Sequence, residues 1–110
     1  EIKVNTDKAV EASIAKVMEG PAARDYYSAA SYYYAEKKDM KKALEWINTS
    51  IEKGYERYWV LRTKSLIQAE LGDKKGAIET ATKSLEMATK DEDTAYIKMN
   101  EASIAEWKKM

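Results

Sequence analysis

Few side chains in this sequence are equipped for catalysis. The 110 residues include no histidine and no cysteine, which leaves carboxylates, lysines and hydroxyls as candidate catalysts or metal ligands. Glu36 and Glu70 could form a pair of carboxylates of the kind that glycoside hydrolases use, but an internal duplication explains their recurrence. The turn at 72–76 lacks the spacing of a phosphate-binding loop. We therefore expect no enzyme activity, no metal site and no cofactor.

The strongest pattern is a repeat. The segment from Ser31 to Lys53 recurs from Ser65 to Met87, 34 residues later and without a gap. The identical pairs are Ser31/Ser65, Ala35/Ala69, Glu36/Glu70, Asp39/Asp73, Lys41/Lys75, Ala43/Ala77, Glu45/Glu79, Ser50/Ser84 and Glu52/Glu86. A period in this range indicates one supersecondary unit that is copied and stacked.

Composition limits the kinds of partner. Nineteen basic and nineteen acidic side chains cancel, without a long block of like charge, so nucleic acid is not expected. No stretch approaches about 20 apolar residues, which argues against membrane insertion. Because the chain opens with Glu1-Ile2-Lys3 instead of methionine, we expect a processed protein or a fragment of a longer one. The absence of cysteine fits a reducing or an oxidising compartment.

Start and stop signals divide the chain into six expected helices. Asp39 is a suitable N-cap, whereas Gly54 and Gly72 are suitable residues to end a helix, and Gly20-Pro21 separates the first two helices. The expected helices span about 6–20, 21–37, 40–54, 57–71, 74–89 and 94–107. Turns of two or three residues require neighbouring helices to form antiparallel hairpins.

Residues of similar type occupy corresponding places in the two units. They are Tyr27, Ser31, Lys38-Asp39 and Ala43 in one unit, and Leu61, Ser65, Gly72-Asp73 and Ala77 in the next. In kind and order they resemble the tetratricopeptide repeat, in which an aromatic residue, a small residue, a glycine-acid turn and an alanine recur every 34 residues. The chain departs from that pattern at Lys64, where leucine is usual, at Lys38, which replaces the turn glycine, and in lacking a closing proline.

The resemblance covers about Arg24 to Asp91 and implies an all-α, right-handed superhelix of two hairpins with flanking helices. The single domain would comprise an N-terminal helix at 1–20, repeat one at 24–57, repeat two at 58–91 and a C-terminal capping helix at 92–110. The flanking helices are expected to cover the apolar ends of the stack.

Four short segments, Lys42–Ile47, Trp59–Arg62, Leu71–Lys75 and Met99–Trp107, resemble the helical C-terminal region of an exported bacterial family of the Bacteroidetes type. The upstream part of that family is β-rich and has no assigned activity. This resemblance implies a periplasmic or cell-envelope location, while a cytoplasmic location stays open.

In tetratricopeptide arrays the first helices line a concave groove that receives a peptide or a partner's helix. The resemblance implies that the groove presents Asp25, Ser28, Tyr32, Glu36, Trp59, Arg62, Leu66 and Glu70. Trp59 and Arg62 are the best candidate anchors, because these residue types often dominate binding energy. Alternatively, Trp59 packs under the neighbouring helix and Arg62 pairs with Glu36 or Glu70. Ser28, Tyr32 and Leu66 are not the lysine and asparagine residues that grip a C-terminal carboxylate in this family.

Five tyrosines crowd the second expected helix. Tyr27, Ala30 and Tyr34 share a spacing that predicts a buried stripe, overlapped by Tyr26 and Tyr33, whereas Tyr32 lies elsewhere on the helix. The lysines at 37, 38, 41 and 42 are expected to form a solvated surface, with an acidic partner as the alternative.

Two functions remain compatible with the sequence. The first is a non-catalytic module that binds a peptide or protein in the groove. The second is a structural appendage that packs on an upstream domain of the same polypeptide or forms a homodimer. The appendage should expose an apolar patch on a terminal helix, such as Trp107 with Ile97, or Val10 with Ile14.

Overall fold

The computed structural model describes residues 22–109. Five α-helices follow one another in this part of the chain, which contains no strand: α2 (Ala23–Ala35), α3 (Met40–Glu52), α4 (Tyr58–Glu70), α5 (Lys74–Lys90) and α6 (Thr94–Lys109). Each begins and ends within two residues of the expected bounds, so the all-α prediction is confirmed. The expected first helix, with Val10 and Ile14, lies outside the described residues.

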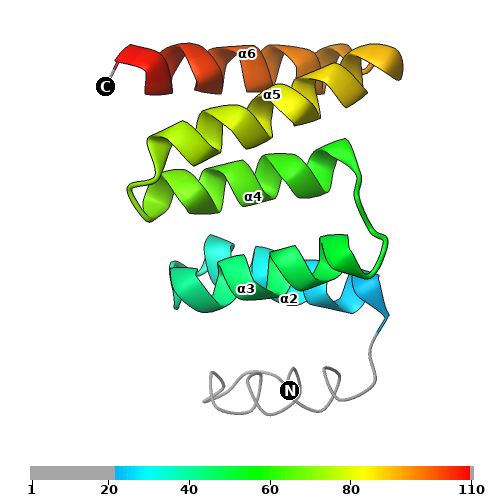
Figure 1. The fold of residues 1–110 in the computed structure, drawn as a ribbon, viewed down its shortest axis with the longest axis vertical. Coiled ribbons are helices and arrows are strands. Elements are labelled where there is room, and N and C mark those ends of the chain that lie inside the picture. Colours follow the sequence, from blue (N-terminus) through cyan, green and yellow to red (C-terminus); the bar gives the residue numbers. More distant parts are fainter. Residues whose placement is uncertain (1–21, 110) are drawn as a thin grey trace.

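The helices stack in chain order, as Figure 1 shows. α2 packs against α3 and α4 packs against α5, while α3 with α4 and α5 with α6 make the contacts between these pairs. The central helix, α4, also contacts both α2 and α6. A surface built from successive first helices therefore has α4 at its centre.

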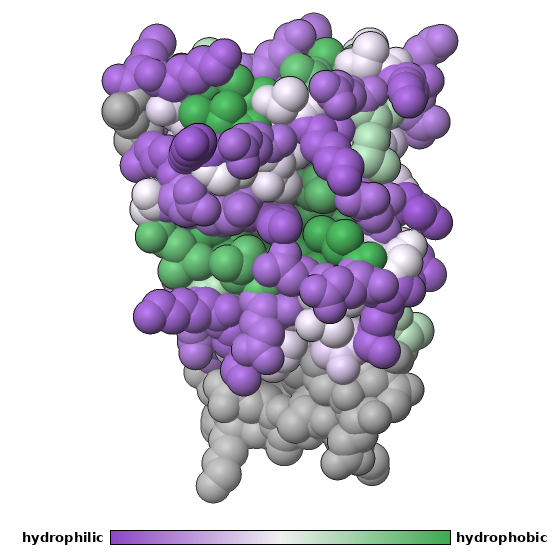
Figure 2. All heavy atoms as spheres, viewed as in Figure 1, coloured by the Kyte–Doolittle hydropathy of each residue, from purple (hydrophilic) through white to green (hydrophobic). Residues whose placement is uncertain are grey.

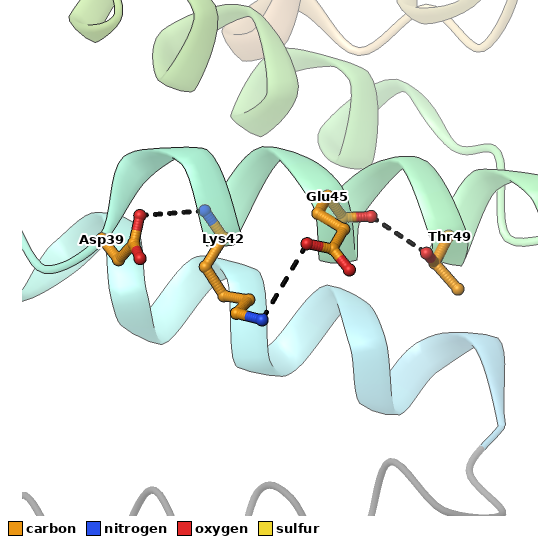
Figure 3. Close-up of polar contacts among 4 residues, drawn as sticks. All are labelled: Asp39, Lys42, Glu45 and Thr49. Atoms are coloured by element: carbon orange, nitrogen blue, oxygen red, sulfur yellow. Dashed lines mark hydrogen bonds and ion pairs between the residues drawn. The ribbon is translucent and has the colours of Figure 1, made fainter.

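Aspartate caps begin the second helix of each pair. Asp39 Oδ1 accepts a hydrogen bond of 3.1 Å from the Lys42 backbone N–H (Figure 3), and Asp73 Oδ1 accepts one of 2.9 Å from Gly76. These bonds satisfy backbone donors that have no partner within the helix. The N-cap that the sequence predicts at Asp39 is confirmed.

The turn between the paired helices is one residue longer in the first pair than in the second. α2 ends with the Lys38 N–H donating to the Tyr33 carbonyl, and α4 ends with Asp73 donating to Gln68, 35 residues later. The N-caps Asp39 and Asp73, however, are 34 residues apart. The first helices therefore repeat at 35 residues and the second helices at 34.

The extra residue changes which position corresponds to the turn glycine. Gly72 follows α4 in the left-handed conformation with φ of 89°, and its counterpart after α2 is Lys37, with φ of 55°. A left-handed residue at this point allows the helix to close with the observed terminal hydrogen bonds. The sequence alignment without a gap assigned this place to Lys38, which is wrong by one residue.

The core lies between the stacked helices. Its larger cluster contains Ala30, Tyr33, Ala43, Ile47, Val60 and Ile67, and a second contains Ala77, Ala81 and Trp107. Hydrophilic side chains cover much of the face drawn in Figure 2, where hydrophobic residues gather between them. Within the predicted tyrosine stripe, Ala30 and Tyr33 are buried, while Tyr27 and Tyr34 are partly buried against the same cluster.

Three equivalent positions bring successive first helices close to their neighbours. Ala30 in α2, Ser65 in α4 and Asn100 in α6 are spaced by 35 residues, and all are 0% exposed. The residue at this position is small in α2 and α4, whereas α6 has the larger asparagine. Asn100 therefore places a larger hydrogen-bonding side chain where α2 has Ala30 and α4 has Ser65, whose hydroxyl donates to the Arg62 carbonyl of its own helix.

Candidate partner-binding surface

Arg62 lies in the middle of α4 and is held by α6. Its Nη1 donates to Asn100 Oδ1 and to Ser103 Oγ, both at 3.2 Å. Trp59 and Leu66, one turn to either side, lie on the same face of α4 because residues three and four apart are helical neighbours. Arg62 is partly buried, so its guanidinium keeps some access to solvent.

The positive charge of Arg62 meets neutral acceptors. In the described part of the chain its hydrogen bonds go to an amide oxygen and a hydroxyl, and the ion pairs there involve other cations. Burial lowers the pKa of Arg62, and the nearby Tyr96 and Tyr34 oppose that shift. The guanidinium stays charged because an arginine pKa is normally above about 12. It is therefore a partly desolvated cation without a carboxylate partner among residues 22–109.

Glu70 has a different partner from the one that the alternative interpretation gave it. Lys37 Nζ lies 2.9 Å from Glu70 Oε2, and this hydrogen bond is the largest cause that raises the pKa of Lys37. Glu36 is exposed where α2 ends. The alternative pairing of Arg62 with Glu36 or Glu70 is wrong, because Arg62 bonds to Asn100 and Ser103 of α6 instead.

A chain of hydrogen bonds supports Arg62 from behind. Asn100, which is fully buried, donates from Nδ2 to Ser84 Oγ at 2.8 Å, and Ser84 donates to the Tyr58 carbonyl at 2.7 Å. The chain joins α6, α5 and α4 and fixes the orientation of the amide, with its oxygen toward Arg62. A buried polar group that is satisfied in this way contributes to a single arrangement of the helices.

A row of aromatic rings runs from α2 across the beginning of α4 to α6. Successive edge-to-face contacts join Tyr27 to Tyr55 (5.8 Å between ring centroids), Tyr55 to Trp59 (6.4 Å), Trp59 to Tyr58 (5.0 Å) and Tyr58 to Tyr96 (5.1 Å). All five rings are partly buried. We call Arg62 with these five rings the Arg62 surface.

Two hydrogen bonds fix rings of the Arg62 surface. Trp59 Nε1 donates to the Tyr55 hydroxyl at 3.1 Å, and the Tyr58 hydroxyl donates to Asp93 at 2.8 Å. Asp93 is the largest cause that raises the pKa of Tyr58 to about 12, with burial next. The rings are thus held in place before any partner arrives.

Of the eight residues that the sequence predicts for partner binding, two belong to the Arg62 surface as defined above. Trp59 and Arg62 belong to the Arg62 surface, and Leu66, on the same face of α4, packs against the core cluster that contains Trp107. Glu70 is paired with Lys37, as described above. The other four residues, Asp25, Ser28, Tyr32 and Glu36, belong to α2 and its C-cap.

Those α2 residues lie on a different face from the one that corresponds to Trp59 and Arg62. With first helices 35 residues apart, the counterpart of Arg62 is Tyr27, whereas the alignment at 34 gives Ser28. One residue rotates a helical position by about 100°. Asp25 bonds the Ala22 backbone at 2.9 Å, and Tyr32 packs on the core cluster.

Sequence reasoning missed the contribution of α6. Tyr96, Asn100 and Ser103 are spaced by four and three residues, which places them on one face of that helix. The signal available in the sequence was this spacing, together with the 35-residue interval from Ser65 to Asn100. The repeat between 31 and 87 does not indicate this face, because α6 lies beyond the duplicated segment.

No family model, curated protein or solved structure matches this chain. Residues 22–109 contain no group of three or more acidic, histidine or cysteine side chains that could hold a metal ion. Within the same range, no helix is both long enough and apolar enough to cross a membrane. A function for the Arg62 surface is therefore inferred from the geometry of the surface itself.

Proposed function

We propose that the chain is a non-catalytic interaction module that binds a peptide or partner protein across α2, α4 and α6. The observation that carries this proposal is Arg62, a partly buried cation with neutral partners on a helix whose aromatic residues contact one another and α6. Arginine, tryptophan and tyrosine are enriched among residues that dominate binding energy. In this proposal the helix pairs form a tetratricopeptide-like superhelix, and its first helices supply the groove.

The proposal requires the Arg62 surface to respond to a ligand. Random linear peptides displayed on phage would be selected against the full chain, and selected peptides would be titrated into isotope-labelled protein. We expect backbone amide shifts to change in α4 and α6, near Arg62 and Asn100, and to remain unchanged in the exposed half of α3. Shifts that gather on another surface, or a selection that yields no binding peptide, would contradict the proposal.

A structural appendage is the second candidate, and Met99 favours it. Met99 and Leu71 are the exposed large hydrophobic residues of the described chain, at 38% and 37% exposure. Met99 lies on α6 together with the exposed Ala95 and Ala102, so a copy of the chain or another domain could pack there. Trp107, which the sequence suggested for such a patch, is only 9% exposed and packs against Ala77 and Ala81 instead.

A further inference from the structure

Arg62 has hydrogen-bonding capacity that its described partners do not use. A guanidinium carries five N–H donors in a planar fork. Among residues 22–109, the hydrogen bonds of Arg62 come from Nη1, and its acceptors are Asn100 and Ser103. Neither Nε nor Nη2 is among the fully buried atoms without a partner in this part of the chain, so both keep some contact with solvent.

The charge of the missing acceptor follows from the surroundings. A partly desolvated cation is stabilised most by an anion, and arginine binds carboxylates through paired, charge-assisted hydrogen bonds. The carboxylates nearest in the network, Asp91 and Asp93, accept from the Tyr58 hydroxyl instead. A ligand carboxylate would therefore supply the charge that the described surface lacks.

The position of Arg62 indicates where in the ligand that carboxylate lies. α4, which carries Arg62, contacts both α2 and α6, and Arg62 is itself hydrogen-bonded to Asn100 and Ser103 of α6. The arginine is thus central, with aromatic rings toward both neighbouring first helices. A chain that crosses all three helices must continue on both sides of Arg62, so the carboxylate belongs to an internal side chain.

We propose that the Arg62 surface binds an extended peptide through an internal aspartate or glutamate, which pairs with the Arg62 guanidinium between apolar side chains that pack on Trp59 and Tyr96. This specificity rests on the proposed binding function and adds the chemistry of the ligand. The buried Asn100 acts as a positioning residue, because it holds Nη1 and leaves the other edge of the guanidinium to the ligand.

The test uses the full chain and the peptides selected by phage display. We expect one internal position enriched in aspartate or glutamate, with apolar residues on both sides. Replacing that acid by its amide should weaken binding about tenfold or more, since a charged hydrogen bond is worth roughly 1.5–3 kcal/mol. The same peptide should lose its preference for the acid over the amide when it is titrated into Arg62→Gln.

Lys64→Gln is the matched control, because it removes the same charge from α4 on another face. Lys64 is partly buried like Arg62. Lys64→Gln should bind the acidic peptide with an affinity within about twofold of the wild-type value. Circular dichroism of both variants checks that the helices persist, and Arg62→Lys should restore part of the preference for the acid because it keeps the charge and loses the planar fork.

Three results would overturn the inference in distinguishable ways. If peptides bind Arg62→Gln as well as wild type, the surface does not recognise an acid, while the binding function stands. If amidation of the peptide C-terminus removes binding, the recognised carboxylate is terminal and not internal. If selection yields no peptide that binds the chain, the proposed function and this inference both fail.

Discussion

Asn100 donates a 2.8 Å hydrogen bond to Ser84 from a position where the two preceding first helices carry Ala30 and Ser65. In the first helix pair, Ser50, the counterpart of Ser84, bonds the Ala23 carbonyl at 2.7 Å. Ser84 makes the corresponding bond to Tyr58 and also accepts from Asn100. The amide thus couples α6 to a hydrogen bond that is already present in the repeated unit.

Asn100→Ala should destabilise the fold by about 1–3 kcal/mol, because it removes a buried hydrogen-bonding group and leaves a cavity. The measurement is urea unfolding followed by circular dichroism. Ser103→Ala is the matched control on the same helix and should cost under about 1 kcal/mol, since Ser103 is partly buried and supplies only one acceptor to Arg62. Equal losses in the two variants would contradict a special role for the buried amide.

Tyr58 should ionise at a higher pH than an ordinary tyrosine does. Its hydroxyl donates to Asp93, which helps to raise its pKa to about 12 from an ordinary value of 10.0. Spectrophotometric titration of the eight tyrosines should show a component near pH 12 that Tyr58→Phe removes. Because the folded pKa exceeds the unfolded pKa, this stabilisation is complete below pH 10 and is lost as pH rises toward 12.

The difference in unfolding free energy between wild type and Tyr58→Phe should therefore shrink across that pH range. Tyr55→Phe serves as a comparison, since the Tyr55 hydroxyl accepts a hydrogen bond from Trp59 Nε1. A late titrating component that survives in Tyr58→Phe would show that another tyrosine produces it.

Substitutions at two helix ends should change stability in opposite directions, because one removes a glycine and the other introduces one. Gly72 has φ of 89° with nothing within 4 Å of an added Cβ, so Gly72→Ala should cost about 1–2 kcal/mol through backbone strain alone. Glu92 occupies the same left-handed place after α5, with φ of 59°, so Glu92→Gly should stabilise by about 0.5–1 kcal/mol. Thermal unfolding checks both, and a change of the same sign in both variants would contradict this assignment.

The helix boundaries could be predicted from the sequence because helix ends depend on local chemistry. Asp39, Gly54 and Gly72 act through bonds to the nearest few residues, which a sequence pattern shows directly. The register of the first helices could not be predicted in this way. It depends on whether Lys37 or Lys38 takes the left-handed conformation. Both residues are lysines, so residue type does not distinguish the two registers.

The sequence pattern also did not predict that α6 contributes residues to the Arg62 surface. A hydrogen bond such as that between Arg62 and Asn100 joins residues 38 apart, and no local periodicity specifies it. The same limit applies to the aromatic contacts, because Tyr58 and Tyr96 meet only when α6 packs beside α4. Residue type identified Trp59 and Arg62 as candidates, whereas packing determines their neighbours.

The one-residue difference in register gives a direct test of which α2 face binds. Tyr27→Leu should weaken binding of the selected peptides about threefold to tenfold, because it removes a ring from the Arg62 surface. Ser28→Ala should leave binding unchanged, since Ser28 is exposed on another face of α2. Isothermal titration with the same peptide measures both. Weaker binding by Ser28→Ala alone would support the alignment at 34 residues instead.

Met99 offers a test that separates the two candidate functions. If α6 packs on a second copy of the chain, light scattering should show a mass that rises with concentration, and Met99→Glu should return it to that of a monomer. A buried methionine contributes about 1.5–3 kcal/mol to such an interface, and a glutamate there would also face its own symmetry mate across a twofold axis. Lys98→Gln, which lowers the net charge by the same one unit, is the control at a neighbouring exposed position. A monomer at every concentration would contradict self-association through α6, and it would leave Met99 exposed while the Arg62 surface remains open to a peptide.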